Sequence, residues 1–398
     1  MPLEFFMRLI ALAGPLSVSV TQIAYGGVIV LFIYGFKKGR IPVNERNPNS
    51  VFFLILIIAL LVTTVCAEDV KRSFGQYKQV LLPLTFLVGY YMYKRPRLDG
   101  VFFWTLTGGA IATVWGIIRG FLYGSPDGNY AILRVAGTFR SSIRFGNLIA
   151  LVTALGICAL LLRFYRSKRE RNIYIAMTLL SFAGLIASGT RGAMIALMAG
   201  IVALLICVFR ARGILLSALV CAVAVLLVYI IPDLRTRFAE SLSFARWGDH
   251  TTSLGWRFVL WEESWRVFRE NPLTGVGFGN LAEYYLKPLK TLHEDGMSVA
   301  HAHNNFLQIL AEHGILGFAA VSLLYIKLAF DQLKGIIAKN RFAIAGFVLL
   351  TVSVSEGITE YSLFNSELCM MFWLLCGGLM AAQNSAQNYK QGKDGFAS

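Results

Sequence analysis

The chain has 398 residues, of which 56% are hydrophobic, and its mean hydropathy is +0.62. This composition excludes an ordinary soluble protein, which would not need so much apolar material. The net charge of +15 would indicate nucleic-acid binding in a soluble protein, but here the basic residues occur in short segments between apolar stretches. The six cysteines lie in or beside those stretches, so no disulfide framework and no CxxC metal site is expected.

Apolar stretches long enough to cross a bilayer follow one another along the chain, and continuous runs of this kind are typical of membrane-spanning helices rather than of barrel strands. In chain order, the sequence predicts spans at 17–36, 51–67, 75–93, 100–123, 145–163, 173–188, 192–210, 213–231, 305–330, 341–358 and 366–383. Residues 3–14 are expected to form a further short helix that Pro15 ends. The prediction is an all-α fold, a polytopic membrane helical bundle with 11–12 transmembrane helices.

The distribution of charge predicts the orientation of these spans. If the basic segment 37–46 is cytoplasmic, the alternation of spans places all the remaining basic segments between spans inside as well. The segments then assigned to the inside hold 19 of the 37 Lys and Arg residues but only 5 of the 22 Asp and Glu residues. The net charge is therefore a positive-inside signal, and no nucleic-acid partner is expected. Residues 124–144, 189–191 and 232–304 are predicted to lie outside.

The long outer segment divides the chain into an N-terminal transmembrane bundle (1–231), a periplasmic loop (232–304) and C-terminal transmembrane helices with a short cytoplasmic tail (305–398). A connection of this length within a compact bundle is rarely without function. Residues 256–270 predict an amphipathic helix that lies along the membrane surface through its aromatic side chains, which are Phe258, Trp261, Trp265 and Phe268. Asn271-Pro272 ends this helix, and the glycines at 275, 277 and 279 predict a flexible bend.

All five histidines lie between positions 250 and 313. No metal site is expected, because alternate side chains such as His301 and His303 diverge on a helix and the chain has no D-x-D motif. His303 precedes the helix predicted to begin at Asn304. The positive end of a helix dipole disfavours an added positive charge, so the imidazole is expected to be neutral and able to accept a proton from a hydroxyl. A surface or capping histidine is the alternative.

Arginines gather on the predicted outer side. Arg191 lies in a tight turn between two spans, where a charge is either functional or an interface anchor. Arg140 and Arg144 precede another span, and Arg257 begins the amphipathic helix. Each of these three alone would be a solvated or headgroup-facing charge. Together, the four arginines suit a lipid-linked diphosphate, because arginine binds phosphate in a bidentate fork and stays protonated.

The motifs and their order resemble the O-antigen ligase and polymerase superfamily of Gram-negative envelopes. These motifs are Thr190-Arg191-Gly192, the Trp-rich helix, the segment 271–277 (NPLTGVG), the segment 301–305 (HAHNN) and the segment 312–317 (EHGILG). The resemblance covers roughly residues 130–320, and the hydropathy profile fits the whole chain.

The resemblance implies an inverting glycosyltransferase of the bacterial inner membrane, a multi-pass protein whose active site faces the periplasm and which uses no metal or other cofactor. It implies that undecaprenyl-diphosphate-linked O-antigen is the donor and lipid A–core the acceptor, with membrane lipids as surroundings. By motif, His303 is the base and Arg191 a diphosphate ligand, while Arg257 is assigned more loosely. Asn304 and His301 support the base. Arg140 and Arg144 depart from the family's usual pattern after Gly137-Thr138-Phe139.

Two alternatives stay open. An O-antigen polymerase uses the same donor, and the spacing of Arg266 to Gly277 is polymerase-like. A transporter of lipid-linked glycans would also have many spans, but it would need charged or broken helices in mid-membrane, whereas the polar residues here gather on one side.

Overall fold

The computed structural model describes residues 2–37, 47–92, 98–124, 134–139, 141–232, 235–236, 238–239, 252–292, 301–364 and 366–394. All regular elements in these ranges are helical, which confirms the predicted all-α polytopic fold. Seven described helices are long and apolar enough to cross a membrane: α6 (Leu98–Tyr123), α7 (Ser142–Leu161), α8 (Lys168–Ser188), α9 (Arg191–Phe209), α10 (Ala211–Ile230), α13 (Asn305–Ile337) and α15 (Ser366–Asp394). Beside them lie α1 (Pro2–Ala13), α2 (Val18–Lys37), α3 (Ser50–Val65) and α14 (Arg341–Glu356).

The span predicted at 75–93 is not one helix. The chain forms α4 (Val70–Val80), a 3₁₀ turn (Leu82–Leu84) and α5 (Thr85–Met92) in its place. Pro83 lies within the turn and lacks the N–H that a continuous helix would need there. The polar side chains of α4 also disfavour a membrane crossing. Asp69 caps this helix by accepting a hydrogen bond from Arg72 N at 2.9 Å.

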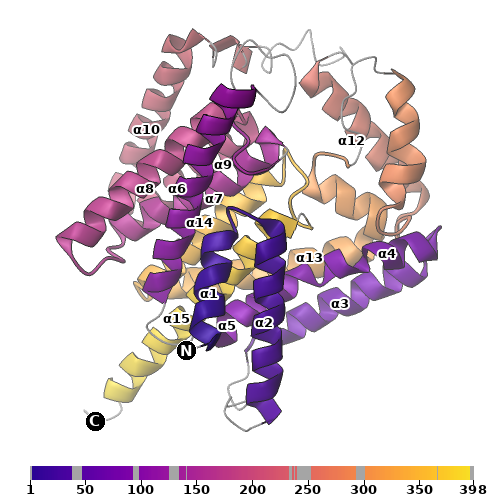
Figure 1. Ribbon diagram of the computed structural model, residues 1–398. Helices are drawn as coiled ribbons and strands as arrows, with labels where there is room; N and C mark the ends of the chain where they lie inside the picture. The colour runs from indigo at the N-terminus through magenta and orange to yellow at the C-terminus, as the bar shows by residue number, and fades with distance from the viewer. Residues whose placement is uncertain are drawn as a thin grey trace.

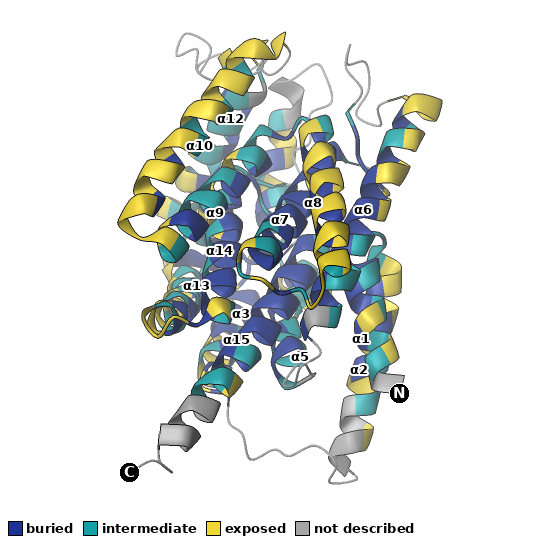
Figure 2. Ribbon diagram, turned by 90° about the vertical axis from the view of Figure 1, so that its left-hand side faces the viewer, coloured by how far each residue is buried: buried dark blue, intermediate teal, exposed yellow. Residues whose placement is uncertain are grey.

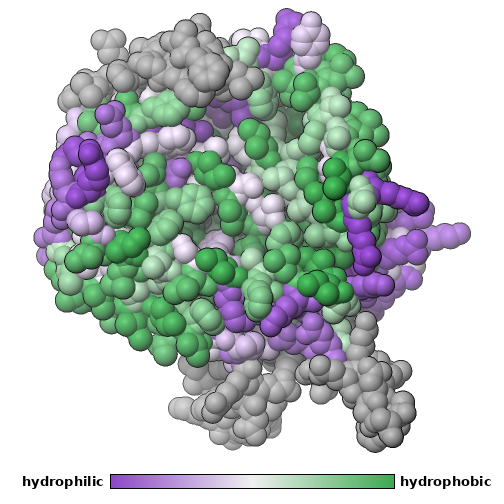
Figure 3. All heavy atoms as spheres, turned by 180° about the vertical axis from the view of Figure 1, so that it is seen from behind, coloured by the Kyte–Doolittle hydropathy of each residue, from purple (hydrophilic) through white to green (hydrophobic). Residues whose placement is uncertain are grey.

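Helices α7 and α15 form the centre of the bundle, as the buried colouring in Figure 2 shows. Helix α15 packs along α5, and two glycines permit this close approach: a Cβ at Gly89 would overlap the carbonyl of Leu374, and one at Gly377 would overlap that of Phe86. Small residues at such contacts are typical of membrane helices, where association depends on close packing. In contrast, α10 is exposed along most of its length (Figure 2), and hydrophobic residues cover much of the face seen in Figure 3.

Helix α12 (Ser253–Glu270) confirms the amphipathic helix predicted in the long loop, and it lies at the end of the bundle opposite to the C-terminus (Figure 1). Thr252 caps it by accepting a hydrogen bond from Gly255 N at 3.0 Å. The face that packs against the protein holds Trp256, Leu260 and Val267, which join a separate small core. The aromatic residues noted in the sequence lie beside this face, and Trp265 is 46% exposed. Contact of these rings with a membrane surface stays a prediction.

The segment 271–279, called the strap below, is held against a break in α13. Gly314 has φ 58° and ψ −163° inside this helix, so the backbone groups around it lose their helical partners. The strap replaces these partners through four backbone hydrogen bonds: Val276 N to Ala311 O, Gly277 N to Glu312 O, Ile315 N to Pro272 O and Leu316 N to Leu273 O, at 2.8–3.2 Å. The three glycines of the strap adopt positive φ. The predicted bend is therefore present, but it is docked rather than flexible.

Candidate active site

His303 lies directly before the N-terminus of α13, as the sequence predicts. Asn304 is the N-cap, and its side-chain oxygen accepts hydrogen bonds from Phe306 N and Leu307 N at 2.9 and 3.0 Å. This satisfies two backbone donors that a helix start leaves unpaired. His303 itself has a φ of 49°, a left-handed conformation that is uncommon for residues other than glycine. Such a backbone is a reason to consider a functional role for the residue, because the fold must hold it there.

Two asparagines fix the start of α13 to the turn that follows α14. Asn305 N donates to Gly357 O at 2.7 Å, and the Asn305 side chain accepts hydrogen bonds from Ser362 N and Leu363 N at 2.8 and 3.1 Å. Asn304 Nδ2 donates to Ile358 O at 2.9 Å. These bonds bring residues 357–363, which lie more than fifty positions away in sequence, against His303. The same turn carries Glu360.

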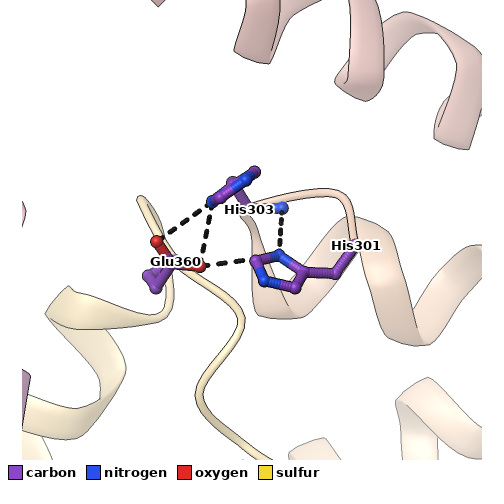
Figure 4. Close-up of side chains that lie close together, drawn as sticks. All are labelled: His301, His303 and Glu360. Atoms are coloured by element: carbon purple, nitrogen blue, oxygen red, sulfur yellow. Dashed lines mark hydrogen bonds and ion pairs between the residues drawn. The ribbon is translucent and has the colours of Figure 1, made fainter. Parts of the chain in front are cut away.

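Glu360 joins the two histidines of the loop into one cluster (Figure 4). Nδ1 of His303 lies 2.9 and 3.0 Å from the two carboxylate oxygens of Glu360, and Nδ1 of His301 lies 3.5 Å from Oε1. The two imidazole rings are 4.2 Å apart. The expectation that His301 and His303 diverge is therefore wrong. Both residues precede the helix, and the left-handed backbone of His303 turns the two rings to the same side.

The neighbours of the carboxylate at the centre of this cluster favour its ionised form. Burial by itself would raise the pKa of Glu360, but the adjacent His303, His301 and Arg257 lower it to about 2. An ionised carboxylate only accepts hydrogen bonds, so Nδ1 of His303 is the donor in this contact. In the neutral imidazole, the proton then lies on Nδ1 and the lone pair on Nε2. Glu360 thus fixes the tautomer in which Nε2 accepts a proton.

The histidine and arginine beside Glu360 respond to burial. Burial lowers the pKa of His301 to about 4, with the Glu360 charge opposing this change and the His303, Arg144 and Arg257 charges adding to it. Burial also lowers the pKa of the Arg257 guanidinium, and Glu360 opposes that shift. Arg257 comes from the first turns of α12, and its Nη2 atom lies 4.0 Å from Glu360 Oε2. The site therefore combines a neutral His301 with a half-buried arginine charge.

The other arginines named from the sequence surround this cluster at different depths. Arg144, on α7, is 57% exposed and lies 3.6 Å from Glu367, and its charge is one of those that lower the pKa of His301. Arg191 is half-buried at the start of α9. Its neighbour Gly192 packs so closely on Thr359 that a Cβ would overlap the hydroxyl, which places the start of α9 against the turn carrying Glu360. Arg140 lies outside the described residues.

Sequence reasoning did not assign Glu360 to this cluster. The residue lies 57 positions from His303, in a short turn with no motif of its own. Glu360 follows Glu356 by four positions near the end of the span predicted at 341–358, and this spacing fits a polar cavity and a structural role equally well. The signal that was available is the pair of asparagines after His303, because adjacent amide side chains at a helix start predict that the segment binds another backbone.

The fold and the cluster define a polytopic helical membrane protein with a polar site at an end of its bundle. Residues 176–322 match the family model described as O-antigen ligase, a region that includes Arg191, Arg257, His301 and His303. This region of the chain is thus similar to the O-antigen ligase family, and the similarity supports a glycosyl-transferring membrane enzyme. It is also similar to an uncharacterized protein of Haemophilus influenzae (strain ATCC 51907 / DSM 11121 / KW20 / Rd), with 22% identity over 355 residues, which are 84% of each chain.

Proposed function

We propose that this protein is an inverting, metal-independent O-antigen ligase that works on the periplasmic side of the bacterial inner membrane. It transfers O-antigen polysaccharide from undecaprenyl diphosphate to a sugar hydroxyl of lipid A–core. The observation that carries the proposal is the contact of His303 Nδ1 with the Glu360 carboxylate at 2.9 Å. A histidine held in this way offers Nε2 as a base beside the half-buried Arg257, within a region that matches the O-antigen ligase family.

His303 acts as the general base in this reaction. Nε2 removes the proton from the acceptor hydroxyl while that oxygen attacks the anomeric carbon of the donor sugar. The new C–O bond forms as the bond from this carbon to the diphosphate oxygen breaks, and the attack from the opposite face inverts the configuration. The proton stays on the imidazole, where the Glu360 carboxylate stabilises the resulting cation, and it leaves to water afterwards. Glu360 is a positioning residue, since it acts through His303.

The arginines stabilise the leaving group. Undecaprenyl diphosphate gains negative charge as the glycosidic bond breaks, and fixed positive charges in a partly dehydrated site lower the energy of that state. Arg257 lies beside Glu360, which contacts the base. Arg191 begins α9, and its neighbour Gly192 packs on Thr359 in the turn that carries Glu360. Arg144 is at the exposed rim, where it suits an entering lipid-linked diphosphate, and Arg140 is assigned the same role from sequence alone. Guanidinium groups can thus take the place that a divalent cation has in other transferases.

The three segments of the chain then have separate tasks. Residues 1–231 supply Arg191 and the other bundle arginines, and residues 232–304 supply Arg257 and the two histidines. Residues 305–398 supply Glu360. The polymerase alternative shares the donor, and the signal that distinguishes it is the spacing of Arg266 to Gly277. The Arg266 side chain forms ion pairs with Glu263 and Glu270 on the surface of α12. It is therefore engaged away from the cluster, which favours the ligase.

Replacement of His303 by asparagine tests the proposal. Asparagine tolerates the left-handed backbone, so His303→Asn removes the base without adding the backbone strain that alanine would add. The variant is expected to be present in the membrane at the normal level but to leave lipid A–core without long glycan, while polymer accumulates on the lipid carrier. Gel electrophoresis and blotting of lipopolysaccharide measure both products.

The same experiment separates the ligase from the polymerase. A polymerase defect leaves core that bears a single repeat unit, so this product would show that the assignment as a ligase is wrong. Unchanged attachment of long glycan would show that His303 is not the base. Purified His303→Asn protein, incubated with lipid-linked donor and lipid A–core, should lose activity about 10²–10⁴-fold, the usual effect of removing a general base.

A further inference from the structure

We propose that His301, His303 and Glu360 also form a binding site for Zn²⁺, and that the bound ion inhibits the transferase. The inhibitory part of this inference rests on the proposed function, whereas the binding part does not. Each of the three residues offers one ligand atom, and these atoms all lie within 4.8 Å of one another. The three side chains converge from two segments of the chain on one point, as Figure 4 shows.

The chemistry of the ligands favours Zn²⁺ over the common hard cations. Two imidazole nitrogens and one carboxylate oxygen match the set that zinc uses where it keeps one coordination position open. Magnesium and calcium prefer sites made of oxygen atoms alone. The described part of the cluster places two nitrogen ligands next to a single carboxylate, so an oxygen-only cage is excluded at this point. A water molecule or a phosphate oxygen would fill the fourth position.

The two pairs that include Glu360 are close to the spacing that zinc requires. Ligand atoms at roughly 2.0–2.2 Å from a tetrahedral Zn²⁺ lie about 3.4 Å from one another. His301 Nδ1 and Glu360 Oε1 are already 3.5 Å apart, and His303 Nδ1 and the same oxygen are 2.9 Å apart. The second pair needs to open by a few tenths of an ångström, as its hydrogen bond is replaced by two bonds to the metal.

A metal at this position prevents proton transfer by His303 in either binding mode. If Zn²⁺ binds Nδ1, the ring proton moves to Nε2, which then has no lone pair for the acceptor hydroxyl. If Zn²⁺ binds Nε2, the metal occupies that lone pair directly. Zinc is therefore an inhibitor here and not a cofactor, which is consistent with metal-independent transfer. The positive charge of Arg257 lies 4.0 Å from Glu360 and weakens binding, so Arg257→Gln is expected to bind Zn²⁺ more tightly.

Binding is tested without reference to activity. The full chain is purified in detergent, stripped with EDTA and titrated with Zn²⁺ by calorimetry, with Co²⁺ absorption as a second probe. One site per chain is expected, weakened about tenfold or more in His301→Ala, His303→Asn and Glu360→Ala. Cys66→Ser and His293→Ala are the controls, since the exposed Cys66 thiol and other loop histidines also attract zinc. Wild-type affinity in the three cluster variants, or loss of binding in a control, would overturn the proposal.

Inhibition is tested on the same preparations. Added Zn²⁺ should reduce transfer by the wild type, and EDTA should restore it. The residual activity of His301→Ala, normalised to its own zinc-free rate, should resist zinc. Stimulation by zinc, or equal inhibition of His301→Ala and wild type, would overturn the inhibitory role. If the wild type binds zinc but His303→Asn keeps full transferase activity, the proposed function is wrong and the zinc site is still supported. If His303→Asn is inactive but the wild type binds no zinc, only the zinc site is wrong.

Discussion

Replacing Glu360 tests how the carboxylate contributes to catalysis. Its contact with His303 Nδ1 at 2.9 and 3.0 Å is a charge-assisted hydrogen bond, which is worth about 1.5–3 kcal/mol against about 0.5–1.5 kcal/mol for a neutral one. Glu360→Gln keeps an acceptor oxygen but loses the charge, so the cost in the transition state is about 1–1.5 kcal/mol, or roughly five- to tenfold in rate. Glu360→Ala loses the whole bond, which predicts a decrease of roughly 10- to 150-fold.

The assay is transfer by purified protein from undecaprenyl-diphosphate-linked glycan to lipid A–core, with kcat and KM measured separately. The decrease should fall on kcat, because a residue that orients the base acts in the transition state and does not bind the ground state. Glu283→Gln is a matched control, since this carboxylate pairs with Arg72 at 3.0 Å and not with a histidine of the cluster. An unchanged kcat in Glu360→Ala, or the same decrease in the control, would refute the assignment of Glu360 as a positioning residue.

Three further predictions concern the strap, the diphosphate and pH. Gly275→Ala should destabilise the protein by more than the left-handed strain of about 1–3 kcal/mol, because its Cβ also meets the backbone between Glu312 and His313. Gly124→Ala, which has a similar φ but open surroundings, measures the strain alone. Equal melting temperatures of the two variants in detergent would contradict the docked strap. Arg257→Lys keeps the charge but not the bidentate fork, so the donor KM should rise about tenfold; an unchanged KM would remove this arginine from the diphosphate site. The pKa of His301 falls from 6.5 to about 4 in the folded state, so the unfolded chain takes up a proton first as the pH falls. Stability is therefore lost between pH 6.5 and pH 4, by up to about 3 kcal/mol. Thermal unfolding of His301→Gln should depend less on pH than that of the wild type, and an identical pH dependence would argue against the burial of His301.

Hydropathy and local signals were sufficient for much of the fold. The apolar runs predicted the long helices, and the Asn304 cap and the Trp-rich period predicted α13 and α12, because these features depend on neighbours within a few positions. The span at 75–93 failed where a local signal, Pro83, was outweighed by average hydropathy. The motif around His303 was also sufficient to propose this residue as the base, since the residues of the motif are consecutive in the chain.

The sequence by itself predicted which side chains carry chemistry, namely the histidine before a helix and the arginines between spans. It also determined the apolar helices that hold them. Only the tertiary structure decided how these side chains meet. Glu360 reaches His303 because Asn305 fixes the turn after α14 to the start of α13, and His301 faces the same carboxylate because His303 has a left-handed backbone. Both arrangements depend on contacts between distant segments, and no periodicity or spacing along the chain encodes such contacts.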